Sequence, residues 1–200
     1  KQINSVFGAV NLGWRNLVYL DATIRGDKSS TLPVNNNTYV YPSVSGSFVF
    51  SELLKRNEIL PYGKMRMSWA QVGSDTDPYK LGLVYSKSKF TYPGYTIGYI
   101  DNEVIPNKDL KPTRTNSFEA GFETKFLNQR LGLDFTYYNQ ISRNQIIGMA
   151  SSWTTGYPYR LINAGEIQNQ GIEIALNTRP VQAGDFSWDL NLNFSKNNNM

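Results

Sequence analysis

The sequence predicts an all-β protein in which about eight antiparallel strands form part of a large transmembrane β-barrel. Three observations carry this prediction. Apolar and polar residues alternate with period two in segment after segment, which gives extended strands one apolar and one polar face. Most segments approach the roughly 9–11 residues with which a tilted strand crosses a bilayer. Short connections alternate with long ones along the chain.

Each expected strand is defined by its apolar face. In the first half the strands cover residues 5–14, 17–26, 41–51 and 63–73, with apolar faces that include Leu12, Leu20, Phe48 and Met67. In the second half they cover residues 117–127, 130–140, 171–178 and 186–195, with apolar faces that include Phe122, Phe135, Ile174 and Phe194. Helical periodicity is nearly absent, and residues 52–59 are expected to form at most one or two helical turns.

The connections divide into two kinds. Residues 15–16, 128–130 and 179–185 form short connections, and residues 52–62, which include Lys55 and Arg56, form one of intermediate length. The segments after Asp27, Ser74 and Ala150 are long, and residues 74–116 form the longest. Short turns on one rim and long loops on the other are typical of an outer-membrane barrel, whose turns are periplasmic and whose loops are extracellular.

A β-sandwich is the alternative that this pattern leaves open. A soluble or surface-exposed binding module, such as a carbohydrate-binding or adhesin-like domain, also alternates inward and outward residues. Small and hydroxyl-bearing residues on the polar faces favour a wet barrel interior instead. The long connection also favours the barrel, because such segments are uncommon in compact domains.

The composition argues against an enzyme. The sequence contains neither Cys nor His, which excludes disulfides, the usual zinc ligand sets, and Cys–His or Ser–His catalysis within this span. We expect no cofactor. The net charge of +4 is scattered, so no nucleic-acid partner is expected. Asp75 and Asp77 offer oxygen ligands for calcium, but their spacing is that of a turn, and we expect no metal.

Five segments resemble SusC/RagA-type TonB-linked (TonB-dependent) outer-membrane transporters. They are Tyr19–Pro33 (YLDATIRGDKSSTLP), Tyr41–Phe50 (YPSVSGSFVF), Gly63–Tyr79 (GKMRMSWAQVGSDTDPY), Leu110–Thr115 (LKPTRT) and Asn163–Glu173 (NAGEIQNQGIE). They occur in order over nearly the whole chain. Thr113 departs from the family pattern, where Glu is common.

The resemblance implies a function and a set of partners. It implies a plugged barrel in the bacterial outer membrane that imports bulky nutrients, either oligosaccharides or oligopeptides, together with a SusD-like surface lipoprotein and the TonB complex. Residues 1–200 would then be part of the barrel domain, with the plug domain upstream and the closing strands downstream. Outer-membrane lipid would contact the apolar faces.

Two sets of candidate functional residues follow. Aromatic residues of the long loops are candidate contacts for the partner lipoprotein or the cargo, because such rings anchor interfaces, although they also pack loops; they are Tyr85, Tyr92, Tyr95, Tyr99, Trp153, Tyr157 and Tyr159. Charged residues on the polar faces are candidate lumen-facing wall charges, which we expect to pair across strands or to touch the plug; they are Asp21, Arg25, Arg66, Glu119, Glu123 and Asp134.

Overall fold

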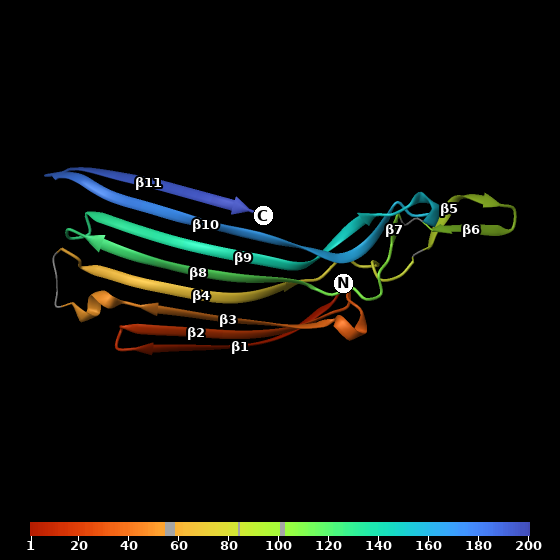
Figure 1. Ribbon diagram of the computed structural model, residues 1–200, viewed down its shortest axis with the longest axis horizontal. Coiled ribbons are helices and arrows are strands. Elements are labelled where there is room, and N and C mark those ends of the chain that lie inside the picture. The colour runs from red at the N-terminus through yellow and green to blue at the C-terminus, as the bar shows by residue number, and fades with distance from the viewer. Residues whose placement is uncertain (55–58, 84, 101–102) are drawn as a thin grey trace.

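The computed structural model describes residues 1–54, 59–83, 85–100 and 103–200. Its main element is one long, curved sheet (Figure 1). Eight antiparallel strands follow the order β1-β2-β3-β4-β8-β9-β10-β11. They are β1 Ile3–Trp14, β2 Val18–Ser29, β3 Thr38–Phe48, β4 Tyr62–Ser74, β8 Thr113–Phe126, β9 Leu131–Ala150, β10 Tyr159–Ala183 and β11 Phe186–Asn199. The expected strand number and antiparallel order are therefore confirmed.

The register places the apolar residues of neighbouring strands directly opposite one another. One continuous row across β3, β4, β8, β9, β10 and β11 consists of Phe48, Met65, Phe122, Phe135, Ile174 and Phe194. Phe122 and Phe135 stack with their ring centroids 5.5 Å apart. No second sheet covers this face in the described part of the chain, and Met67 on the same face is 58% exposed. A soluble sandwich would bury such a face.

The two ends of the sheet differ. Short connections gather at one end, whereas the connections β2–β3, β4–β8 and β9–β10 gather at the other (Figure 1). Arg15 and Asn16 both have positive φ, of 51° and 54°, as the central residues of a hairpin turn need for the twist of its strands, and the Leu17 N–H closes the turn on the Trp14 carbonyl at 2.9 Å. The short-turn rim and the long-loop rim were both expected from the sequence.

The long connection contains structure that the sequence reading missed. Residues 74–116 were expected to form a loop, but they include β5 Tyr85–Tyr92 and β6 Tyr95–Ile100, which form a separate two-stranded sheet. They also include β7 Val104–Ile105, which pairs in parallel with the start of β10. The connection between β9 and β10 is shorter than expected, because β10 begins at Tyr159, well before the strand start expected at residue 171; β9 ends at Ala150, where the long segment was expected to begin.

Helical structure is limited to single turns among the described residues. These are η1 Val34–Asn36, η2 Phe50–Leu53 and η3 Trp153–Thr155, all of the 3-10 type. The turn expected within residues 52–59 thus begins earlier and ends sooner, and Lys55 and Arg56 lie outside the described residues. No helix in the described ranges is long and apolar enough to cross a membrane.

Candidate functional site

The polar face of the sheet carries all six charged residues that were predicted to face the lumen. Asp21 and Glu119 belong to one row across β2, β3, β4 and β8, because Asp21 pairs with Ser45, Ser45 with Ser68, and Ser68 with Glu119. Glu123 lies opposite Asp134 on β9, and Arg25 pairs along its own strand with Asp27 at 2.8 Å. That this face lines the lumen remains a prediction.

Arg66 holds the centre of this polar face. Its guanidinium donates to both carboxylate oxygens of Asp134 at 2.7 and 3.0 Å and to the Thr136 Oγ1 at 2.6 Å. Arg66 belongs to β4 and its partners to β9, so the side chain crosses β8 over Gly121, which lies opposite it in the register. Because the two charges cancel, the Arg66–Asp134 pair adds no net charge to the polar face.

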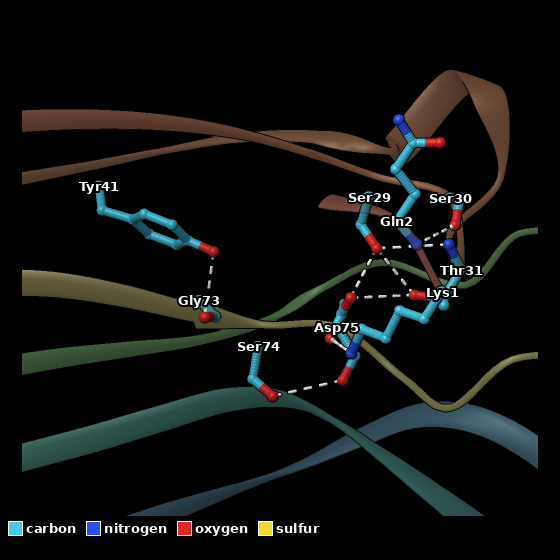
Figure 2. A network of polar contacts seen from close by, with 9 residues as sticks. All are labelled: Lys1, Gln2, Ser29, Ser30, Thr31, Tyr41, Gly73, Ser74 and Asp75. Atoms are coloured by element: carbon cyan, nitrogen blue, oxygen red, sulfur yellow. Dashed lines mark hydrogen bonds and ion pairs between the residues drawn. The ribbon is translucent and has the colours of Figure 1, made fainter. Parts of the chain in front are cut away.

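A polar cluster ties three segments together at the long-loop rim (Figure 2). The Asp75 carboxylate accepts hydrogen bonds from Ser29 at 2.5 Å and Thr31 at 3.0 Å, and the Lys1 Nζ lies 2.5 Å away. Ser29 is fully buried and Thr31 nearly so. We call these four residues the Asp75 clasp. It joins the end of β4 to the β2–β3 connection and to the start of β1.

The electrostatics of the clasp favour a charged Asp75. Burial raises the pKa of the Asp75 carboxyl group, but hydrogen bonds from Lys1, Ser29 and Thr31 outweigh it, so the pKa lies below its ordinary value of 3.8. Its oxygens are therefore occupied by protein donors. No group of three or more side chains that could hold a metal ion occurs in the described ranges.

A second polar contact ties the far end of the long connection to β10. The Asn163 side chain accepts a hydrogen bond from the Lys111 backbone N–H at 2.8 Å and donates to the Lys111 carbonyl at 2.8 Å. It also donates to the Asn144 carbonyl at 3.0 Å. We call this contact the Asn163 clasp. It holds the segment just before β8.

A small apolar core lies between the two clasps. Leu32, Tyr39 and Leu110 are buried, and partly buried residues pack against them, among them Leu81 and Leu161. Leu81 precedes β5 in the chain and Leu110 follows β6. The core therefore holds the two ends of the long connection close together.

The β5–β6 hairpin presents one aromatic face. Tyr92 lies opposite Tyr95 and their ring centroids are 6.4 Å apart. Tyr99, four residues along β6 from Tyr95, shares that face because side chains alternate. Tyr85 lies on the other face, since its neighbour Ser86 pairs with Tyr99. Tyr92 and Tyr95 are 67% and 71% exposed, so both rings are largely accessible.

The remaining predicted aromatic residues are more scattered. Trp153 belongs to η3 and is 78% exposed, and Tyr157 lies in the same connection. Tyr159 was predicted to lie in a loop, but this is wrong: it is the first residue of β10 and pairs with Ala150. Tyr159 belongs to the strand because β9 and β10 stay paired as far as Ala150 and Tyr159. A contact role for any of these aromatics stays a prediction.

The comparisons with known proteins decide the family. Residues 1–199 match the family described as TonB dependent receptor-like, beta-barrel. The chain belongs to this family. The all-β prediction and the outer-membrane β-barrel location are thereby confirmed, and matches to SusC and to the RagAB transporter confirm the resemblance to SusC/RagA-type receptors. TonB-dependent receptors are transporters, not enzymes, as the composition indicated.

Curated relatives match nearly the whole chain. It is 27% identical to TonB-dependent receptor P26 of Formosa agariphila over 99% of its residues, which is 20% of that protein. It is also 27% identical to TonB-dependent receptor SusC of Bacteroides thetaiotaomicron, over 98% of this chain and 20% of that one. The chain thus spans about a fifth of the length of these relatives.

Solved structures show the same fold. The RagAB peptide transporter matches with a TM-score of 0.88 at 23% identity, over 98% of this chain and 22% of that one. The siderophore receptor PirA of Pseudomonas aeruginosa matches with a TM-score of 0.64 at 19% identity, over 98% and 34%. These matches show that the fold is shared, and the family match over residues 1–199 identifies the eight-stranded sheet as part of a TonB-dependent receptor barrel.

Sequence reasoning missed the two clasps. Asp75 was considered only as a metal ligand or turn residue, and Asn163 was not singled out. Their signal lay in the family-like segments, since Ser29, Thr31, Asp75, Lys111 and Asn163 all belong to them.

Proposed function

We propose that this chain is part of the barrel wall of a TonB-dependent importer that carries bulky nutrients across the outer membrane. The observation that carries the proposal is the uncovered apolar face of the eight-stranded sheet opposite a charge-paired polar face, in a chain that matches the receptor barrel over residues 1–199. Lipid covers the apolar face. The polar face bounds the translocation path, and Asp21, Arg25, Arg66, Glu119, Glu123 and Asp134 belong to it.

In this proposal the whole of residues 1–200 is barrel, and the plug domain and the TonB-contacting segment belong to other parts of the complete protein. Energy then comes from the TonB complex acting on the plug, outside this span. Family membership supports the proposal. The barrel residues described above act as a fixed frame around the plug.

The cargo class is an oligosaccharide or an oligopeptide. One structure of matching fold is that of the RagAB peptide transporter, which favours a peptide. The alternation of aromatic and polar side chains along the hairpin suits either cargo, because rings stack on sugars as well as on side chains.

A SusD-like surface lipoprotein is the proposed partner, and the aromatic face of β5–β6 is the proposed contact. Tyr92, Tyr95 and Tyr99 lie on one face of an element that stands beyond the sheet at its long-loop end (Figure 1). Aromatic side chains of this kind dominate interface energetics because they bury large areas at low entropic cost.

The test is to purify the complete protein from native outer membranes in mild detergent and to identify by mass spectrometry what accompanies it. A lipoprotein with a trapped peptide or glycan is the expected result. Recovery of the receptor with neither, from membranes that contain both, would contradict the proposed partnership.

Two matched variants locate the contact. Tyr95→Ser removes a ring from the aromatic face, whereas Tyr85→Ser removes the same ring from the opposite face of the same hairpin. Tyr95→Ser should lower lipoprotein recovery at least several-fold, while Tyr85→Ser should leave it near the wild-type level. Equal recovery from both variants would remove the aromatic face from the interface.

A further inference from the structure

We propose that Asp75 and Asn163 are positioning residues that fix the base of the long connection, so that the β5–β6 hairpin is held at a set orientation above the rim. The hairpin, residues 85–100, is called the arm. The positioning role stands on the geometry of the clasps. Its consequence for partner binding rests on the proposed function.

The first support is the way in which the chain leaves the sheet. β4 ends at Ser74, and Asp75 is the next residue. Its carboxylate is only 10% exposed and is held by donors that lie 44 to 74 residues away in the sequence. Charge-assisted hydrogen bonds of this kind are stronger than neutral ones. The chain is therefore fixed at the point where it departs towards the arm (Figure 2).

The return of the chain is fixed in the same manner. Asn163 bonds both the N–H and the carbonyl of Lys111, as a neighbouring strand would, although it does so with its side chain. Slightly earlier, the Asn107 side chain donates to the Leu161 carbonyl at 3.2 Å, and β7 pairs with β10 at Tyr159 and Arg160. Every one of these contacts is made to β10.

Within the described ranges, strand pairing gives the arm no support from the main sheet. In the described ranges, β5 and β6 pair only with each other and form a sheet separate from the main one. A two-stranded hairpin is marginally stable alone. Its direction is consequently set where its two ends are anchored, by the clasps and by Leu81 and Leu110 in the core between them.

Anchoring matters for binding because a mobile contact surface loses conformational entropy when it docks. A surface that is already oriented does not incur that cost. Loosening one clasp should therefore weaken binding of the lipoprotein roughly tenfold without removing a single residue from the aromatic face.

The experiment measures arm orientation and partner binding separately in the complete protein. Spin labels are placed on Lys87→Cys, on the arm's opposite face, and on Val34→Cys in η1, since the chain has no native cysteine. Pulsed electron resonance gives the distance distribution between them. It is compared for the parent, for Asp75→Ala and Asn163→Ala, and for the control Asp77→Ala, whose exposed side chain has no hydrogen bond or ion pair within the described part of the chain.

The expected result is a distribution that is narrow in the parent and in Asp77→Ala and clearly broadened in both clasp variants. An unchanged distribution in Asp75→Ala and Asn163→Ala would overturn the positioning role. If an alanine variant does not reach the outer membrane, the near-isosteric Asp75→Asn and Asn163→Asp provide the same comparison.

Lipoprotein recovery from the same samples separates this inference from the proposed function. Broadening together with weaker recovery supports both. Broadening with full recovery supports the positioning role and contradicts the proposed docking on the arm.

Discussion

Arg66 on β4 pairs with Asp134 on β9, although β8 lies between them. The pairing is possible because the residue of β8 beneath the guanidinium is Gly121, and a Cβ atom there would lie 3.2 Å from the Arg66 Nε. The contact therefore depends on three strands at once. The contact also explains why a glycine stands at position 121, which the alternation of apolar and polar residues does not.

A double-mutant cycle should detect this pair. Arg66→Ala and Asp134→Ala should each destabilise the folded barrel, and the double variant should be less destabilised than their sum by about 1 kcal/mol, because a two-pronged arginine contact exceeds an ordinary surface pair. Both side chains are about one third exposed, 38% and 33%, so water limits the coupling. Urea unfolding in detergent or lipid supplies the energies, and strict additivity would show that the two groups act independently.

Gly121→Val should be more damaging than either charge deletion. A Cβ at this position would also lie 2.5 Å from the Phe135 carbonyl oxygen, and backbone cannot move aside as a side chain can. We expect a loss of about 1–3 kcal/mol, the usual range for overpacking. Gly26→Val, at a position with open space around it, serves as the matched control. A Gly121→Val barrel as stable as the Gly26→Val barrel would refute the close approach.

Strand faces could be predicted because period two leaves little choice. Once Leu133 and Phe135 define one face of β9, a shift of one residue would turn every polar partner to the wrong side. The antiparallel order then follows from the short turns. The same reasoning weakens where the alternation breaks: Asn144 and Gly165 both have positive φ, and the part of β10 before Gly165 was expected to be loop.

The arm and the clasps were harder to predict for different reasons. Pro93 and Gly94 form a turn signal, with Gly94 at a φ of 83°, but the register of β5 shifts between Lys87 and Thr91, which hides its alternation. The clasps join residues such as Ser29 and Asp75 that are 46 positions apart. No local pattern encodes such a contact.

The face assignment makes a direct prediction for adjacent residues of β11. Leu192 pairs with Leu176 on the apolar face, and Asn193 lies on the polar face opposite Ala175. Leu192→Arg should destabilise the barrel by about 2–4 kcal/mol, the cost of a cation facing the middle of the bilayer, and Asn193→Arg should cost far less because water reaches its face. Folding yield into lipid vesicles and urea titration measure both. A larger loss of stability for Asn193→Arg than for Leu192→Arg would show that the two faces are assigned the wrong way round.

The Asp75 clasp should respond to acid in a specific direction. Because its pKa is lowered in the folded state, Asp75 stabilises the clasp fully above the unfolded value of 3.8, and this stabilisation is lost as the pH falls from there through the folded-state pKa. Between about pH 7 and pH 5 the clasp should therefore not change. Below that window, the distance distribution between labels on Lys87→Cys and Val34→Cys should broaden in the parent as protonation removes the ion pair with Lys1. Asp75→Asn has no charge to lose, so its distribution should stay constant over the same titration. A parent that broadens between pH 7 and pH 5, or an Asp75→Asn variant that broadens in step with the parent at lower pH, would show that a group other than Asp75 controls the arm.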